Sequence, residues 1–530
     1  MTVVAKRPDA PRSGRAAFLV ATGILSSRLV GLVRQRVFAH YFGLTAPADA
    51  FMAAFRIPNV LNNLFGEGAL SASFIPVYAA LLARGAREEA DRVAGAVASL
   101  MALAVSLVVA VGVLVTPILI DLIAPGFTGS TRTLTILLVR ILFPGAGLTV
   151  MSAWCLGILN SHHKFFVSYA APIAWNAAMI TTLVVFGRRV DLPGLAVALA
   201  WGSVAGAALM FVVQLPIVWG VAPHLRFAVD RASEHVRTIV RNFGPVFVSR
   251  GVVQLSGYID TLLASFLGTG AVTAIANAQT MYLLPVSLFG MSVSAAELPT
   301  MSGIGGDDEA AIVRVRTRLA AGLRRIAFFV VPSSMAFLAL GDVIAGALFQ
   351  TGRFGHRDTL YVWGILAGSA VGLLASTLGR LYSSTYYALR DTRTPLNYAM
   401  LRVTLTTALG YVFAIPLPRL LGVPPSWGAA GLTASAGIAG WMEMLLLRHT
   451  MNRRIGPTGL PAIYLARLWT AAALGAAVGW GVKLAAPAMN PVFMAAIVLV
   501  PYGVTFFAAT FVFGVPEVSD LLAQVKKLAR

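Results

Sequence analysis

Apolar segments long enough to cross a lipid bilayer recur from one end of this 530-residue chain to the other. A spanning helix needs about 20 predominantly apolar residues. Fourteen segments meet this requirement: 16–43, 49–83, 92–118, 132–160, 167–187, 192–220, 236–267, 271–300, 320–349, 359–388, 396–417, 426–449, 463–486 and 491–514. Only 12% of the residues are charged, about half of the share that is usual in a soluble domain. We therefore expect an all-α membrane protein with about 14 transmembrane helices.

Lysines and arginines are distributed unequally between the loops that join these segments. Most of the 41 lie in the two terminal tails and in alternate loops, for example at 84–92, 226–241, 314–325 and 448–467. Basic loops remain on the cytoplasmic side of a membrane. Because an even number of helices returns the chain to the side where it began, we expect both termini in the cytoplasm. No cleavable signal pattern is found, so the first segment is expected to be a retained helix.

Two stretches of the chain share an ordered set of residues about 225 positions apart. Ser27-Arg28, Phe42, Pro58, Phe65-Gly66 and Pro76 correspond to Ser249-Arg250, Phe266, Pro285, Phe289-Gly290 and Pro299. Duplicated halves with a substrate site between them are common in transporters. The spacing predicts two six-helix lobes related by a parallel repeat, followed by two C-terminal helices.

This repeat divides the chain into parts. Residues 1–15 are expected to be a cytoplasmic tail and 16–220 the N-terminal lobe. The C-terminal lobe would occupy 221–417, with its last helix at 426–449. The final helix pair would lie within 450–514, and 515–530 would form a second cytoplasmic tail.

Eight arginines fall inside or at the edge of the apolar segments: Arg28, Arg34, Arg36, Arg56, Arg140, Arg250, Arg380 and Arg402. Each costs at least ~2.5–3.5 kcal/mol at the centre of a bilayer, so it should face a wet interior or have a partner. In the first lobe these arginines outnumber Asp49 and Glu67, and the second lobe offers Asp260 near Arg250. An excess of guanidinium over carboxylate groups favours an anionic ligand, and the arginine fork suits phosphate oxygens.

The second apolar segment is the most irregular. It contains Pro58, the pair Asn62-Asn63, Gly66 and Gly68 on either side of Glu67, and then Pro76. Proline removes a backbone donor, and irregular backbone persists at membrane depth only where protein or water satisfies it. We therefore expect a broken helix beside a polar cavity.

Several classes of function lack any supporting pattern. The single cysteine, Cys155, excludes a disulfide framework and a multi-cysteine metal site. We find no Ser/His/Asp set, no phosphate-binding glycine loop and no zinc-ligand spacing. We therefore predict that the protein is not an enzyme and has no metal site and no cofactor. A coupling cation or the membrane potential would supply the energy for its conformational cycle. The net charge of +20 arises mainly between apolar segments, which argues against nucleic acid as a partner.

Several short motifs follow one another along the chain: Ser27-Arg28-Leu29-Val30-Gly31-Leu32-Val33-Arg34, Ala48-Asp49-Ala50-Phe51, Phe55-Arg56-Ile57-Pro58-Asn59, Phe65-Gly66-Glu67-Gly68-Ala69, Ala124-Pro125-Gly126-Phe127, Leu348-Phe349-Gln350-Thr351-Gly352-Arg353-Phe354 and Asp391-Thr392-Arg393-Thr394-Pro395. In this order they resemble the MurJ/MviN family of lipid II flippases. The resemblance implies a fourteen-helix transporter of the multidrug/oligosaccharidyl-lipid/polysaccharide type. Its two lobes would surround a cationic cavity, and its last two helices would form a groove for the lipid tail.

The resemblance also implies a function and partners. We expect this chain to move lipid II, an undecaprenyl-diphosphate-linked peptidoglycan precursor, from the inner to the outer leaflet of a bacterial inner membrane by alternating access. Membrane lipids and proteins of cell-wall synthesis are the further partners that it implies. Arg28 and Arg34 would contact the diphosphate, Asp49 would shape or gate the cavity, and Arg56 falls where a basic residue is usual.

Three departures from the family pattern change the charge, and two of them replace arginines. Asn62-Asn63 occupies positions where arginines are common, Gln35 replaces a frequent acidic residue, and Thr280 lies where an Arg-Leu pair is usual. Arg250 would compensate for the arginine missing from the second lobe. The substrate-binding set expected from the sequence is Arg28, Arg34, Arg56, Asp49, Asn62, Asn63, Glu67, Arg250 and Asp260.

Three alternatives remain open at this point. The first is a flippase for another undecaprenyl-linked saccharide, which would share the same lipid anchor. The second is a cation-coupled drug exporter of the same superfamily, which would need acidic residues in place of the excess arginines. The third is a scaffold for wall-synthesis proteins that transports nothing.

Overall fold

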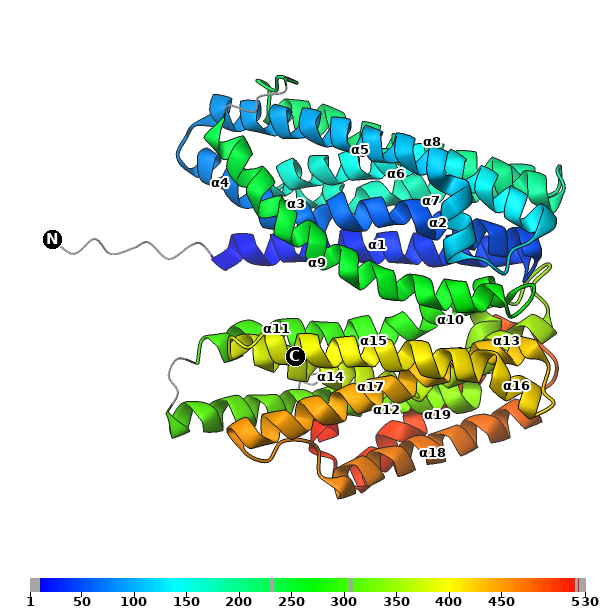
Figure 1. The fold of residues 1–530 in the computed structure, drawn as a ribbon. Coiled ribbons are helices and arrows are strands. Elements are labelled where there is room, and N and C mark those ends of the chain that lie inside the picture. Colours follow the sequence, from blue (N-terminus) through cyan, green and yellow to red (C-terminus); the bar gives the residue numbers. More distant parts are fainter. Residues whose placement is uncertain (1–9, 229–232, 305–307, 520–522, 524–530) are drawn as a thin grey trace. The chain divides into compact units, whose positions relative to one another are not determined.

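A computed structural model of the chain describes residues 10–228, 233–304, 308–519 and 523, without the side chains of residues 10–21, 24, 67–68 and 245–257. Its contacts divide the chain into two compact units, Met1–Leu262 and Leu263–Arg530. Each unit is a bundle of helices, and the residues that the model describes form no β-strand (Figure 1). The all-α fold class predicted from the sequence is thereby confirmed.

The first unit is built from long helices and one interrupted helix. Its elements are α1 (Ala10–Phe42), α2 (Ala46–Phe65), α3 (Glu67–Ser73), α4 (Ile75–Ala83), α5 (Arg87–Ile123), α6 (Gly129–Ser161), α7 (Phe165–Phe186), α8 (Leu192–Val221) and most of α9 (Glu234–Ser265). The division between the units lies inside α9, whereas the lobe boundary expected from the sequence precedes this helix. The reason is packing, because the Phe243 ring of α9 contacts Phe65 at a centroid distance of 5.4 Å.

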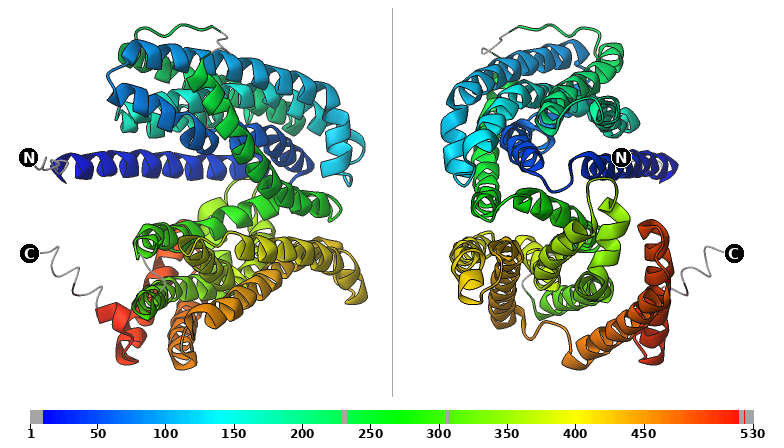
Figure 2. Two further views of the ribbon diagram at one scale, coloured as in Figure 1. Left: turned by 60° about the vertical axis from the view of Figure 1, so that its left-hand side comes forward. Right: turned by 90° about the vertical axis from the view of Figure 1, so that its right-hand side faces the viewer.

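The second unit contains the remaining helices. They are α10 (Ala271–Pro285), the π-helix η1 (Val286–Met291), α11 (Ser292–Ser302), α12 (Glu309–Phe349), α13 (His356–Ala370), α14 (Leu373–Ala388), α15 (Arg393–Ala414), α16 (Pro416–Leu420), the 3₁₀-helix η2 (Pro425–Trp427), α17 (Gly428–Ile455), α18 (Ala462–Ala485) and α19 (Pro491–Val512). The last two pack against α12 (Figure 2). There the Trp480 indole N–H donates to the Ala339 carbonyl oxygen at 2.7 Å.

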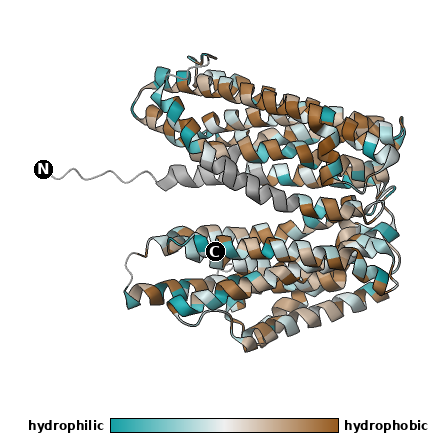
Figure 3. Ribbon diagram, viewed as in Figure 1, coloured by the Kyte–Doolittle hydropathy of each residue, from teal (hydrophilic) through white to brown (hydrophobic). Residues whose placement is uncertain are grey.

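Most of these helices can cross a membrane. Among the described residues, eleven are long and apolar enough, or twelve if the bent pair α13–α14 is one span. Hydrophobic residues occupy much of the helix lengths (Figure 3). Each of the fourteen predicted segments coincides with a helix or an interrupted helix. The two not counted as spans fall on α1 and α9, of 33 and 32 residues, and parts of both lie outside the description, so the number fourteen stays a prediction.

The basic loops of the first unit meet at one end of its bundle. The Tyr78 hydroxyl of α4 and His162 Nε2, just beyond α6, are 2.9 Å apart. The His224 backbone N–H, just beyond α8, donates to the Asp91 carboxylate near the start of α5 at 3.0 Å. Loops that the charge pattern assigns to the same side of the membrane therefore lie together.

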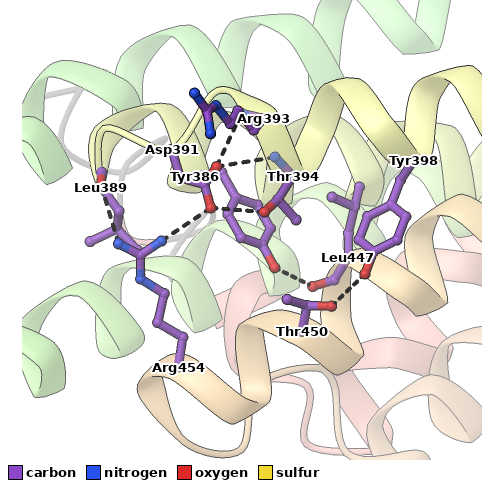
Figure 4. A network of polar contacts seen from close by, with 9 residues as sticks. All are labelled: Tyr386, Leu389, Asp391, Arg393, Thr394, Tyr398, Leu447, Thr450 and Arg454. Carbon is purple, nitrogen blue, oxygen red and sulfur yellow. Dashed lines mark hydrogen bonds and ion pairs between the residues drawn. The ribbon is translucent and has the colours of Figure 1, made fainter.

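One end of the second unit is held by a polar network around Asp391 (Figure 4). Its carboxylate accepts hydrogen bonds from the backbone N–H groups of Arg393 and Thr394, both at 3.1 Å, and from the Thr394 hydroxyl at 2.8 Å. Arg454 of α17 pairs with it at 3.3 Å. Burial opposes ionisation of Asp391, but these hydrogen bonds and the Arg454 charge together hold its pKa below the usual value. The loop between α14 and α15 is thereby fixed to the end of α17.

The second span is broken, as the sequence predicts. It comprises α2, α3 and α4, with interruptions at Gly66 and Phe74. A Cβ added at Gly66 would lie 2.1 Å from the carbonyl oxygen of Asn62, so only glycine fits this close approach. The proposed repeat counterpart, α10 to α11, is interrupted by a π-helix that contains Gly290. Both Phe-Gly motifs therefore lie at irregular backbone, which is consistent with the repeat.

Candidate functional site

A polar cavity of about 780 Å³ lies inside the first unit, between helices that are apolar enough to span the membrane. Side chains from α1, α2, α3, α6, α7 and α8 line it. They are Arg34, Phe55, Pro58, Asn59, Asn62, Asn63, Ser71, Leu142, Gly145, Ala146, Thr149, Ser152, Ala153, Leu156, Ser168, Pro172, Trp175, Ser203, Ala207 and Met210. Among the side chains that the structure describes, this lining contains one charged group, Arg34, and no carboxylate. Such a cavity favours an anionic or neutral polar ligand over a cation.

Arg34 of α1 is held by uncharged neighbours. Its guanidinium lies over the Trp175 ring, 4.9 Å from the centroid, and its Nη1 contacts the Met179 sulfur at 3.7 Å. No carboxylate among the described residues forms an ion pair with it. Cation–π contact orients a guanidinium without neutralising its charge. Arg34 therefore retains a positive charge that a ligand can use.

Trp175 is itself fixed from two directions. Its indole N–H donates to the backbone and side-chain oxygens of Ser203 at 3.1 and 3.2 Å. The Phe55 ring stacks against it with a centroid distance of 5.7 Å and an interplanar angle of 24°. An indole held in this way provides a rigid surface for Arg34.

Asn62 and Asn63 line the same cavity at the end of α2. Gly66 donates its backbone N–H to the Asn62 carbonyl at 2.8 Å, and α2 ends there. The close approach at Gly66 fixes where α2 stops and therefore where these amides lie. The structure thus brings together three residues of the predicted set, Arg34, Asn62 and Asn63.

Arg56 lies on α2 but does not line this cavity. Its Nη1 donates to the Thr261 hydroxyl of α9 at 2.8 Å, and its backbone oxygen accepts from the Tyr258 hydroxyl at 3.4 Å. Asp260 precedes Thr261 and is half-buried. Arg56 is therefore directed toward α9, and none of its described contacts is a carboxylate.

The remaining predicted residues lie outside this cavity or outside the description. Asp49 is 2% exposed in the first turn of α2, about 20 Å along the helix from Asn62 at 1.5 Å per residue. Arg28 is exposed on α1, about 9 Å along the helix from Arg34. The side chains of Glu67 and Arg250 are not among those described.

Sequence reasoning missed the roles of Trp175, Ser203 and Asn59. Asn59 and Asn62 are three positions apart, a spacing that places both on one helix face. Helical spacing alone predicts this second amide. Trp175 and Ser203 lie on α7 and α8, and only the packing of these helices against α1 and α2 reveals them.

The arginines of the second unit are in different surroundings. Arg402 of α15 forms an ion pair with Glu443 of α17 at 3.0 Å, which satisfies the expectation of a partner. Arg380 is exposed on α14. The described residues contain no group of three or more His, Cys, Asp or Glu side chains arranged to hold a metal ion.

Comparison with known proteins shows which family has this architecture. The sequence profile of the family described as lipid II flippase MurJ matches residues 38–500. The probable lipid II flippase MurJ of Rhizobium meliloti (strain 1021) is 30% identical over 533 residues, covering 96% of this chain and 95% of that protein. The lipid II flippase MurJ of Burkholderia cenocepacia is 30% identical over 446 residues, covering 83% and 84% respectively.

Solved structures agree at the level of the fold. A structure titled lipid II flippase MurJ, inward closed conformation, superposes with a TM-score of 0.76 at 24% identity, covering 95% of this chain and all of that one. An inward-facing multidrug resistance MATE family transporter gives a TM-score of 0.62 at 16% identity, covering 81% of this chain and 95% of its own. On the strength of the profile match and the near full-length relatives, this multi-span membrane protein belongs to the lipid II flippase MurJ family.

Proposed function

We propose that this chain is a lipid II flippase of the bacterial inner membrane. It would move the lipid-linked precursor from the inner to the outer leaflet by alternating access of its lobes, without hydrolysis. Full-length similarity to proteins named as lipid II flippases supports this function. The observation that carries it is Arg34, a guanidinium in a cavity between membrane-spanning helices, with no carboxylate partner among the described residues.

A bare guanidinium at this depth is costly unless a ligand or water compensates it. Diphosphate oxygens accept hydrogen bonds from both arms of an arginine, and the contact strengthens where water is scarce. Arg34 would therefore hold the diphosphate of the substrate. Arg28, about two turns away on α1, and Arg56, which is directed toward α9, would provide further contacts as the lobes move.

Asp49 has a different proposed role. It is buried in the first turn of α2, where the helix dipole favours a negative charge. Its distance from Asn62 separates it from the cavity, so it would influence access through the position of α2. Glu67, Arg250 and Asp260 would complete the polar surface that the headgroup meets.

The lipid tail would lie against the C-terminal helices. α18 and α19 carry large exposed apolar side chains, including Leu474, Leu484, Phe493, Val504 and Phe511. Exposed apolar faces of membrane-spanning helices contact acyl chains. A coupling cation or the membrane potential would restore the inward-facing state, because one charge moved through 100 mV supplies about 2.3 kcal/mol.

Transport of labelled lipid II in proteoliposomes tests the function. We expect Arg34→Ala to reduce the rate at least ~10-fold, because a charge-assisted hydrogen bond contributes about 1.5–3 kcal/mol. Arg34→Lys should retain part of the rate, since it keeps the charge but loses the fork. Arg189→Ala is the matched control, because it removes an arginine from an exposed loop. Wild-type protein that moves another undecaprenyl-linked saccharide but not lipid II would overturn the proposal.

Orientation is tested with single cysteines. The one native cysteine, Cys155, is buried, so a membrane-impermeant maleimide reports only on an introduced cysteine. With both termini in the cytoplasm, Arg189→Cys should react in intact cells and Arg84→Cys only after permeabilisation. The reverse pattern would show the opposite orientation.

A further inference from the structure

The cavity of the first unit has more amide and hydroxyl groups than a diphosphate can use. Asn59, Asn62 and Asn63 lie along one turn of α2, and Ser71, Ser152 and Ser203 lie across from or beyond them on three other helices. We infer that this part of the cavity is a subsite for an uncharged N-acetylated sugar. The inference rests on the proposed function and specifies which portion of the headgroup the first unit recognises.

The hydrogen-bonding chemistry of the lining carries the argument. An asparagine amide both donates and accepts hydrogen bonds, whereas ionised phosphate oxygens only accept. A diphosphate would therefore leave the amide oxygens of α2 facing negative charge. An N-acetylated sugar has hydroxyl and amide N–H donors together with carbonyl and ether acceptors. It can satisfy both ends of each asparagine.

Two of these amides are available to a ligand. The side chains of Asn59 and Asn62 make no hydrogen bond within the described residues, although both line the cavity. The cavity itself lies among spanning helices, where an unsatisfied polar group is expensive. In a cavity without substrate only water could satisfy them, and sugar hydroxyls are the natural replacement.

The facing hydroxyls are prepared to donate. Ser203 accepts the Trp175 indole N–H, and Ser152 accepts the side-chain amide of Gln214. Since each serine oxygen already accepts a hydrogen bond, its own proton remains for another acceptor. Donors on α6 and α8 thus complement the bifunctional amides of α2.

The charge of the cavity selects the sugar over the peptide of the same headgroup. The sugar is bonded directly to the diphosphate, so a diphosphate at Arg34 brings it next to the α2 amides. The peptide lies farther along the headgroup and ends in carboxylate groups. The described lining offers no second cation to neutralise them.

Binding of two ligands separates this subsite from the diphosphate contact. The probes are undecaprenyl diphosphate, which lacks the saccharide, and lipid II, both measured with the full-length protein in detergent. Asn62→Leu should weaken lipid II binding about 3- to 10-fold, as expected for one lost neutral hydrogen bond, and leave undecaprenyl diphosphate binding unchanged. Asn62→Ser should restore part of the difference, because it returns a donor and an acceptor.

Control variants and opposite outcomes complete the test. Asn397→Leu removes an exposed asparagine from α15 in the second unit and should change neither affinity. Equal loss of both ligands in Asn62→Leu, or loss of neither, overturns the sugar subsite while leaving the flippase function intact. Wild-type protein that binds undecaprenyl diphosphate but fails to transport lipid II overturns the flippase function, and the subsite with it.

Discussion

The ion pair between Lys483 and Asp342 provides a quantitative test of how the C-terminal helices are held. Lys483 of α18 bonds to the Asp342 carboxylate of α12, and its Nζ lies 4.5 Å from the Trp480 ring centroid. The lysine side chain is 24% exposed and the aspartate 8%. The second aspartate oxygen, Oδ1, is buried and has no hydrogen-bond partner in the part of the chain that the structure describes. Asp342 therefore depends on Lys483 for compensation of its charge.

Removing either partner should have unequal effects on the free energy of unfolding. Breaking a buried pair leaves an uncompensated charge and costs about 3–5 kcal/mol. Because water reaches the lysine, we expect Lys483→Met to lower the free energy of unfolding by about 2–4 kcal/mol, since it leaves the buried aspartate charge without its partner. Asp342→Asn should cost only about 1–2 kcal/mol, since the lysine can turn toward water and keep its aromatic contact.

The double variant measures the coupling energy between the two residues. Lys483→Met with Asp342→Asn removes both charges, so it should cost no more than Lys483→Met alone, leaving a coupling of about 2 kcal/mol. The measurement is reversible denaturation of all four proteins in detergent micelles. Additive effects, within about 0.5 kcal/mol, would refute the reasoning. Arg132 and Asp121, an ion pair with 37% and 59% exposure, form the matched control, and their cycle should show no coupling.

Three further outcomes follow from the structure. Gly66→Ala should destabilise the protein by about 1–3 kcal/mol, whereas Gly220→Ala, where a Cβ meets nothing within 4 Å, should be neutral or slightly stabilising in the same denaturation assay. Trp175→Leu should weaken undecaprenyl diphosphate binding about 3- to 10-fold by removing the cation–π support of Arg34, and Trp175→Phe should recover most of it. Wild-type stability should fall as the pH drops below about 4, in part because the pKa of Asp391 is depressed in the folded state and folding then opposes its protonation. Asp391→Asn should be less stable at neutral pH and show a smaller loss of stability on acidification than the wild type. A pH profile that the substitution leaves unchanged would contradict this prediction.

The features that the sequence predicted well depend on local pattern. Hydropathy located the spans because a bilayer imposes one length and one polarity on every crossing. The break between Pro58 and Gly68 was predictable because proline and glycine act on the backbone of their own segment. The fold class, the spans and this irregular helix could therefore be predicted without tertiary information.

The features that it predicted poorly depend on which helices face each other. Arg28 and Arg34 look equivalent in sequence, yet only Arg34 lines the cavity. Lys483 resembles a loop residue, but it contacts an aspartate 141 positions away. Hydropathy does not fix the rotation of one helix against another, so the surroundings of individual charges required the structure.

Two helices are much longer than a membrane is thick. α5 has 37 residues, and α12 has 41 with a kink at Leu340. At 1.5 Å per residue, α5 is about 55 Å long and the part of α12 before the kink, residues 309–339, is about 46 Å long. To fit inside about 30 Å of hydrocarbon, they would have to tilt by about 57° and about 50°, beyond the usual range of 0–40°. Each helix must therefore emerge from the bilayer, and the charged N-terminal turns, with Glu88 and Glu89 on α5 and Arg314 and Arg316 on α12, mark the protruding ends. Each unit thus has a helix end that extends beyond the lipid surface, where a water-soluble macromolecule would touch it before it reached the lipid.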